Sequence, residues 1–450
     1  MTSSNKISKR KSIIEGDTSK DTFSDLELDE WVVRACSYLG IHHPTPVQSN
    51  CIPAILRGRD CIGCAETGSG KTAAFALPIL QTLAVDPYGI FALVLTPTRE
   101  LAIQIADQFK AFGAHISIRV TVVVGGMDMI EQGIMLANKP HVVVGTPGRL
   151  ADHLKSTDFS LKKVRYLVLD EADRLLAPSF QPDLETIFSS LPARRQTLIF
   201  SATLTDTLKQ LSAITNDNCF SWTEPRQTAT VSTLDQKYIF IPAKVRDVYL
   251  THLVDLFHTI ENKTVLVFTS TCKSCQVLTE LLRKLDCPCV CMHSIMNQSE
   301  RIASLAKFKS SLIKVLVSTD VGSRGLDIPR VGVVINYNVP ASPKDYVHRV
   351  GRTARAGLYG RAVTLVSQFD VKRLLAIEKL ISTKMEKFEL QESVVLKKLQ
   401  TVSIARREVE VRLKENEFGE KQRINKAKRK LLEDALREQD ELESEIKRKK

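Results

Sequence analysis

Long apolar runs are missing from this 450-residue sequence, and so is an apolar segment near its N-terminus. No stretch approaches the roughly 18 apolar residues that a membrane-spanning helix needs. Residues 1–20 are mostly polar and lack the apolar core of a secretory signal. These absences argue against a membrane partner and against export, so we expect a reducing, intracellular environment.

The ten cysteines lack the spacing of a disulfide framework. Two pairs have CxxC spacing, beginning at Cys61 and Cys272, but they lie too far apart for the usual zinc ribbon. A further three cysteines fall within residues 287–291. We expect ordinary reduced thiols throughout.

The bulk composition is that of a folded protein, with 43% hydrophobic and 25% charged residues. A chain of this length exceeds one hydrophobic core, which favours two globular domains with tails. The net charge is +12, with 63 basic and 51 acidic residues. This balance favours a polyanionic partner without identifying one.

Short apolar, β-branched runs recur, each followed by a polar loop and a longer helical pattern. This alternation is typical of βαβ units around a parallel sheet. Two series are present, at residues 91–95, 120–124, 142–144, 166–169 and 197–200, and at 265–268, 289–292, 314–317, 331–335 and 362–366. The sequence therefore predicts an α/β protein with two similar domains in tandem, joined through a polar stretch near residues 221–243.

The last part of the chain is charged. From Arg406 to Lys450, 15 residues are basic and 12 are acidic, with helix-supporting pairs such as Glu433/Arg437. We expect a solvated helical tail, with a weak RNA or partner contact as the alternative. Near the other end, Lys9–Lys11 is a candidate nuclear-import signal.

A glycine-rich loop precedes the helical pattern at residues 73–83. It reads Ala65, Glu66, Thr67, Gly68, Ser69, Gly70, Lys71, Thr72. The glycines allow backbone N–H groups to point at phosphate oxygens, and the loop ends at a helix N-terminus, which favours anions. Lys71 would bind the β- and γ-phosphates, and the Thr72 hydroxyl would ligate Mg²⁺. Ala65 replaces the first glycine of the general pattern, yet the context still predicts an ATP site.

Three carboxylates follow the apolar strand at residues 166–169: Asp170, Glu171 and Asp173. Such dense like charge indicates a nearby cation. With the glycine-rich loop upstream, Asp170 is the expected partner of Mg²⁺, and Glu171 the residue that positions or deprotonates the attacking water.

The segment Asp170-Glu171-Ala172-Asp173 resembles the motif that names the DEAD-box RNA helicases. Other motifs of that family occur in order: Phe23 with GIHHPTPVQ at residues 40–48, PTREL at 97–101, Gly125-Gly126, TPGR at 146–149, SAT at 201–203, Gln298 with Arg301, STDVGSRGLD at 318–327 and HRVGRTAR at 348–355. The resemblance implies two tandem RecA-like domains that hydrolyse ATP when they close over one nucleotide.

Several roles are implied mainly by this resemblance. The Gln48 amide has the donor and acceptor needed to recognise one adenine edge, so ATP should be preferred over GTP. The family pattern further assigns base stacking to Phe23, ribose contact to Asp327, arginine fingers to Arg352 and Arg355, and coupling between ATP hydrolysis and RNA to Asp173, Ser201, Thr203 and His348.

RNA contacts are expected around Pro97, Thr98, Arg99, Gly125, Gly126, Thr146, Arg149, Arg301 and Thr319. Glycines permit close backbone approach, and hydroxyl groups reach phosphates or 2′-OH groups without reading bases. We therefore expect RNA binding that depends on salt and not on base sequence.

The expected organisation is a polar tail at 1–20, an ATP-binding helicase domain at 21–222, a linker at 223–243, a helicase C-terminal domain at 244–385 and a charged, largely helical tail at 386–450. Stretches such as DPYGIF at 86–91 and TCKSCQ at 271–276 resemble the nucleolar branch of the family. That likeness implies a monomeric motor acting on ribosomal precursor RNA and pre-ribosomal proteins during small-subunit assembly, in the nucleus and nucleolus.

Two alternatives share the same motifs. One is an ATP-gated RNA clamp that holds proteins on RNA with little unwinding. The other is a motor directed at DNA. Local strand separation on RNA is the preferred interpretation, because the family grips a bent single strand that a continuous duplex does not fit.

Overall fold

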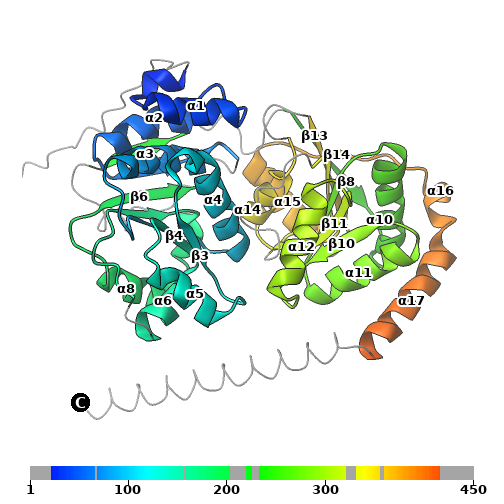
Figure 1. The fold of residues 1–450 in the computed structure, drawn as a ribbon. Coiled ribbons are helices and arrows are strands. Elements are labelled where there is room, and N and C mark those ends of the chain that lie inside the picture. The colour runs from blue at the N-terminus through cyan, green and yellow to red at the C-terminus, as the bar shows by residue number, and fades with distance from the viewer. Residues whose placement is uncertain are drawn as a thin grey trace, which may run out of the picture.

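The computed structural model describes residues 22–65, 68–156, 159–202, 219–224, 233–320, 331–354 and 359–415. These residues form two α/β domains, which lie side by side in Figure 1. Each contains a seven-stranded sheet in which all paired strands are parallel. The predicted pair of tandem RecA-like domains is confirmed.

The first domain has the strand order β3-β4-β2-β5-β6-β1-β7. Its strands are β1 (Cys61–Cys64), β2 (Ala92–Leu95), β3 (Val120–Val123), β4 (Val142–Gly145), β5 (Tyr166–Leu169), β6 (Gln196–Ser201) and β7 (Phe220–Thr223). Its helices are α1 (Glu30–Tyr38), α2 (Pro46–Leu56), α3 (Lys71–Val85), α4 (Arg99–Phe112), α5 (Met129–Ala137), α6 (Pro147–Ser156), α7 (Ala172–Leu175) and α8 (Gln181–Ser189).

Both faces of this sheet are covered by helices, and successive strand residues alternate between them. Ala92 and Val94 pack with α1 to α4, whereas Leu93 and Leu95 pack with α5 to α8. Burial on both faces explains why the strands read as continuous apolar runs.

The second domain has the strand order β10-β11-β9-β12-β13-β8-β14. Its strands are β8 (Leu234–Phe240), β9 (Val265–Thr269), β10 (Cys289–Met292), β11 (Val315–Thr319), β12 (Val333–Asn336), β13 (Gly360–Val366) and β14 (Glu386–Lys387). Its helices are α10 (Arg246–Val254), α11 (Cys272–Lys284), α12 (Gln298–Lys309), α14 (Pro343–Val350), α15 (Val371–Ile381), α16 (Glu392–Leu396) and α17 (Leu399–Glu415).

The expected linker at 223–243 extends too far, because β8 lies inside it and pairs with β13 along its whole length. The chain after residue 385 also differs from a solvated tail over its described part. There β14 pairs with β8, and α17 places Val409 and Leu413 against Val277 of α11. Apolar side chains spaced along α17 therefore dock it on the second domain.

None of the helices in the described ranges combines the length and apolar character that crossing a membrane requires. All ten cysteines fall in the described ranges, and none of them forms a disulfide there. Burial raises the pKa of Cys36 and of Cys64 to about 11, so these thiols stay protonated at neutral pH.

Candidate nucleotide and RNA site

The glycine-rich loop joins β1 to α3. Gly68 and Gly70 have φ values of +89° and +90°, in the left-handed region that glycine adopts without strain. Gly70 is the N-cap of α3, a helix of 15 residues whose N-terminal N–H groups form an anion site. The predicted loop residues thus lie between the end of β1 and the first turn of α3, except for Glu66 and Thr67, which lie outside the described residues.

Lys71 lies where the glycine-rich loop meets the carboxylates that follow β5. Its ammonium donates to the carbonyl of Ala65 at 2.6 Å. Burial lowers the pKa of Lys71, while the negative charges of Asp170, Glu171 and Asp173 oppose that shift. A half-buried cation and three carboxylates, separated by about a hundred positions in the chain, therefore form one electrostatic cluster.

Asp170 is 4% exposed, and its carboxylate accepts from the N–H of Glu171 at 3.0 Å. Burial raises the pKa of Asp170 to about 6, although Lys71 favours its charged form. Glu171 has a φ of 51°, which is uncommon for a residue with a side chain. Its carboxylate is held by Arg174 at 3.2 Å, so its position is fixed from both backbone and side chain.

Two predicted coupling residues of the first domain are in contact. The hydroxyl of Ser201, at the end of β6, donates to the carboxylate of Asp173 at 2.9 Å. This bond joins the loops that follow two neighbouring strands. The third predicted coupling residue of this domain, Thr203, lies outside the described residues.

Gln48 is 3% exposed and lies against the glycine-rich loop. Its side-chain carbonyl accepts from the N–H of Thr45, and its amide donates to the carbonyl of Gly70, both at 3.0 Å. The amide predicted to recognise adenine therefore also holds the loop in place.

Phe23 is 2% exposed and belongs to the hydrophobic core of the first domain. The ring packs in this core, and the base-stacking role that the family resemblance implies stays a prediction. Apolar burial outweighs the polar setting of the nearby motif.

The predicted RNA residues of the first domain follow the carboxyl ends of β2, β3 and β4. Thr98 is the N-cap of α4, and Thr146 donates its N–H to the carbonyl of Val123. Gly126 has a φ of +82°, and a Cβ there would lie 2.5 Å from the Arg99 guanidinium. Ligands of parallel sheets bind at this edge.

Positive charge converges beside these glycines. Burial lowers the pKa of Arg99, and the nearby charges of Arg301 and Arg149 lower it further. The Arg149 guanidinium donates to the carbonyl of Met127 at 2.8 Å, which fixes its position. Guanidinium groups of both domains therefore lie near one another beside these glycines.

Glu100 connects the two domains, a role the sequence did not reveal. It is 3% exposed, and its carboxylate accepts from Gln298 at 3.0 Å and pairs with Arg301 at 2.9 Å. Gln298 and Arg301 lie on α12 of the second domain. The Arg301 guanidinium forms this inter-domain ion pair, and the RNA contact expected of it stays a prediction.

In the second domain, α14 carries His348 and ends near Arg352. Arg352 is 2% exposed, and its Nε donates to the carbonyl of His348 at 3.3 Å. Arg349 anchors the helix through its Nη2, which contacts Asp320 at 2.6 Å. The sequence did not single out Arg349. The predicted residues Asp327 and Arg355 lie outside the described residues, and Thr319 ends β11 with 6% exposure.

Comparisons with known proteins also divide the chain into two domains. The family model described as DEAD/DEAH box helicase matches residues 45–211, and that described as helicase conserved C-terminal domain matches residues 248–357. The chain is 56% identical over 416 residues to the probable ATP-dependent RNA helicase DDX49 of Homo sapiens, covering 91% of this chain and 86% of that protein. It is 46% identical over 430 residues to the ATP-dependent RNA helicase DBP8 of Scheffersomyces stipitis, covering 92% and 96%.

Solved structures with the same fold include Mss116p bound to single-stranded RNA and AMP-PNP, with a TM-score of 0.77, 31% identity and coverage of 86% and 84%. Dbp5 of S. cerevisiae bound to RNA and ADP BeF3 gives a TM-score of 0.74, with 28% identity and coverage of 86% and 99%. Sequence, fold and motif geometry agree, and the chain belongs to the DEAD-box family of ATP-dependent RNA helicases.

Proposed function

We propose that this helicase is an ATP-gated clamp on single-stranded RNA, which it uses to separate short duplexes locally. The observation that carries the proposal is the contact of Glu100 with Gln298 and Arg301, because it joins the domains beside the predicted RNA residues. Support also comes from Mss116p, whose solved structure contains single-stranded RNA and AMP-PNP.

ATP and Mg²⁺ fit the residues that surround Lys71. The positive φ values of Gly68 and Gly70 turn the loop toward a helix N-terminus, as phosphate binding requires. In the described part of the chain, no group of three or more His, Cys, Asp or Glu side chains forms a metal cage. That suits Mg²⁺, which is commonly held by one or two protein oxygens together with phosphates and water. Thr72 and Asp170 would hold it, and the ion would neutralise charge on the phosphates.

Hydrolysis needs a group that directs water and groups that balance developing negative charge. Glu171 supplies the first, because its backbone and its ion pair with Arg174 fix the carboxylate. Arg352 and Arg355 of the second domain supply the second, since guanidinium groups are always charged. Hydrolysis then depends on the second domain being in place, which links turnover to closure.

RNA would be held through its backbone. Arg99 and Arg149 provide charge, Gly125 and Gly126 allow close approach, and Thr98 and Thr146 offer hydroxyl groups. None of these contacts reads a base, so affinity should fall with salt and vary little with sequence.

We further propose that the RNA is ribosomal precursor RNA, bound together with pre-ribosomal proteins during small-subunit assembly in the nucleolus. The likeness of DPYGIF and TCKSCQ to the nucleolar branch supports this, and the net charge of +12 suits a polyanion. Crosslinking the protein to RNA in cells and sequencing the bound fragments tests it. Reads spread over messenger RNA, with none on ribosomal precursors, would refute it.

Strand displacement measured beside ATP hydrolysis tests the helicase activity against the clamp alone. We expect RNA-stimulated hydrolysis and ATP-dependent release of a strand of about ten base pairs, a length that local opening can separate. Vigorous hydrolysis without release would favour a clamp with little unwinding. Equal stimulation by DNA and RNA oligomers would favour a DNA-directed motor.

A further inference from the structure

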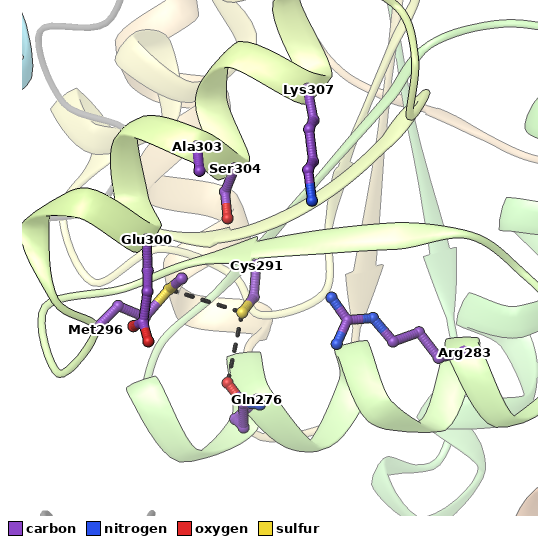
Figure 2. A pocket seen from close by; sticks show the side chains of 8 residues that line it. All are labelled: Gln276, Arg283, Cys291, Met296, Glu300, Ala303, Ser304 and Lys307. Atoms are coloured by element: carbon purple, nitrogen blue, oxygen red, sulfur yellow. Dashed lines mark hydrogen bonds between the residues drawn. The ribbon is translucent and has the colours of Figure 1, made fainter.

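A cavity of about 330 Å³ lies in the second domain between α11, α12 and β10 (Figure 2). Its lining residues are Gln276, Arg283, Cys291, Met296, Glu300, Ala303, Ser304 and Lys307. None of them belongs to the motifs of the nucleotide site or to the expected RNA contacts. The cavity is therefore a separate feature.

The cavity lies at the free edge of the sheet. Among the strands in the described ranges, β10 is the outermost of this sheet and pairs only with β11. Leu278 of α11 packs on the face that contains Cys289 and Cys291, whereas Leu305 of α12 packs on the face that contains Val290. The two helices thus cover opposite faces, and residues of both line the open cavity beside β10. An edge of this kind is a common place for another chain to dock.

The charges within the cavity are unevenly placed. Figure 2 shows Lys307 of α12 and Arg283 of α11 directed toward one end from opposite sides, with Glu300 at the other end. Lys307 forms no ion pair with any residue in the described ranges. The Nε of Arg283 donates to the carbonyl of Cys289 at 3.0 Å, and one Nη contacts Glu280 at 2.9 Å. Arg283 is thereby held in place, and its side chain remains 44% exposed.

The inner surface of the cavity includes apolar, polarizable sulfur groups. The thiol of Cys291 lies 3.4 Å from the Gln276 carbonyl oxygen and 3.7 Å from the Met296 sulfur. Burial raises the pKa of Cys291, so the thiol is a packing group at neutral pH. A flexible thioether beside it adapts to apolar side chains of different shape.

We propose that this cavity is a docking site for an acidic segment of a partner protein. A carboxylate of the segment lies between Arg283 and Lys307, and a neighbouring apolar side chain packs on Met296 and Cys291. A protein segment suits the site better than RNA, because Glu300 and Glu280 interrupt the basic surface and an RNA backbone favours a continuous basic groove.

Docking there would act on the helix that joins the two domains. Glu300, Ala303, Ser304 and Lys307 follow helical spacing along one side of α12. On the same helix, Gln298 and Arg301 contact Glu100 of the first domain. A segment bound in the cavity therefore stabilises the position of α12 that closure uses, and it strengthens the response of hydrolysis to RNA.

Fluorescein-labelled peptides of one Gly/Ser/Leu composition, carrying Glu, Gln or Lys at the same positions, test the proposal on the full chain. Fluorescence anisotropy should show binding of the Glu peptide alone. Lys307→Ala should weaken the affinity for the Glu peptide about tenfold, because one charge-assisted contact is lost. Lys307→Arg should retain that affinity. Lys372→Ala, an exposed lysine on α15, is the matched control and should have no effect.

Failure of the Glu peptide to bind, or binding insensitive to Lys307→Ala, would overturn the docking site. Single-stranded RNA that displaces the peptide and itself loses affinity in Lys307→Ala would make the cavity part of the RNA path. ATPase titrations with RNA, at a Glu-peptide concentration just sufficient to saturate the wild type, should show a lower RNA requirement in the wild type, Lys307→Arg and Lys372→Ala than in Lys307→Ala. An unchanged requirement would overturn the coupling through α12. Matching thermal unfolding of the variants establishes that they fold.

Discussion

Counted in chain order within each domain, the strands of both sheets lie in the same order, 3-4-2-5-6-1-7. The connections that leave equivalent strands are different. After β1 comes a glycine-rich loop that leads to Lys71, whereas after β8 come Ile241, Pro242 and a short 3-10 turn. Proline lacks an N–H group, so this second turn is poorly suited to holding phosphate. One scaffold is repeated, and the nucleotide loop is present in one copy.

The residues that follow the fifth strand also differ between the two domains. β5 leads into Asp170 and Glu171, whereas β12 leads into Tyr337, whose hydroxyl donates to Asp247 of α10 at 2.6 Å. In the proposed function the first connection carries the chemistry, whereas the second fixes a helix. The proposal thus places function in the loops at the strand ends and not in the sheet that the domains share.

The largest effect should come from Glu171→Gln, which keeps the shape of the side chain and removes the base. Turnover should fall about a thousandfold, while ATP and RNA binding persist. Single-turnover hydrolysis and filter binding measure the two quantities. Glu185→Gln, at an exposed position on α8, is the control. A normal kcat in Glu171→Gln would show that Glu171 is not the catalytic base. The difference between the residues that follow β5 and β12 would then not identify that base.

Arg352→Ala should rank next, because the second domain enters the chemistry through its guanidinium groups. We expect kcat to fall about a hundredfold with little change in nucleotide affinity, since Arg355 remains. Steady-state ATPase with saturating RNA measures kcat and KM separately. Arg373→Ala, a half-exposed arginine on α15, is the control. An effect confined to KM would assign Arg352 to binding and leave the charge balance to the first domain.

A double-mutant cycle on Glu100 and Arg301 would show how strongly the two domains depend on each other. Glu100→Gln and Arg301→Gln should each lower RNA-stimulated hydrolysis about thirtyfold, because each leaves a buried partner unpaired. The double variant should be no worse than either single one. Additive losses would mean that the two side chains act in separate places, for example with Arg301 on RNA as the family pattern implied.

The strands and the ATP site were predictable because their signals are local. Apolar runs identified ten strands, and the glycine-rich loop and the Asp-Glu-Ala-Asp motif each lie within eight consecutive residues. The sequence pattern did not predict β8, because this strand is only half-buried and carries polar residues such as Asp235 and Lys237. Its formation depends on pairing with β13.

Contacts that depend on tertiary structure left no pattern in the sequence. Glu100 meets Arg301 across 201 positions, and Arg349 meets Asp320 between separate elements. Phe23 received its base-stacking role from the family resemblance alone, and the structure places its ring in the hydrophobic core. Sequence motifs thus predicted the chemistry of the first domain. The contacts that join the two domains could be identified only from the three-dimensional structure.

Gln48→Ala should have a smaller effect, and it separates two roles of one side chain. If Gln48 recognises adenine, ATP affinity should fall about tenfold and GTP affinity should change little. If its bonds to Thr45 and Gly70 matter only for holding the loop, both nucleotides should weaken equally. Competition binding with labelled nucleotide measures the ratio. Asn50→Ala on the same helix, whose amide contacts the carbonyl of Pro46, is the control.

The smallest expected effect concerns the residues that follow the third strand of each domain. β3 leads to Gly125 and Gly126, whereas β10 leads to His293, which is 1% exposed. Burial lowers the pKa of His293 to about 4, and the charge of Arg301 adds to the shift. The folded state thus binds this proton less readily than the unfolded chain, so the contribution to stability is present above the unfolded pKa and lost as the pH falls.

From pH 7 to pH 6 the loss attributable to His293 should be about 0.7 kcal/mol, using an unfolded pKa near 6.5. Urea unfolding at both pH values measures it, and His293→Gln should remove this part of the pH dependence while still being able to contact Gln276. An equal pH dependence in both proteins would mean that His293 is accessible to protons. The end of β10 would then resemble the open end of β3, and the contrast between the two domains would be weaker at that position.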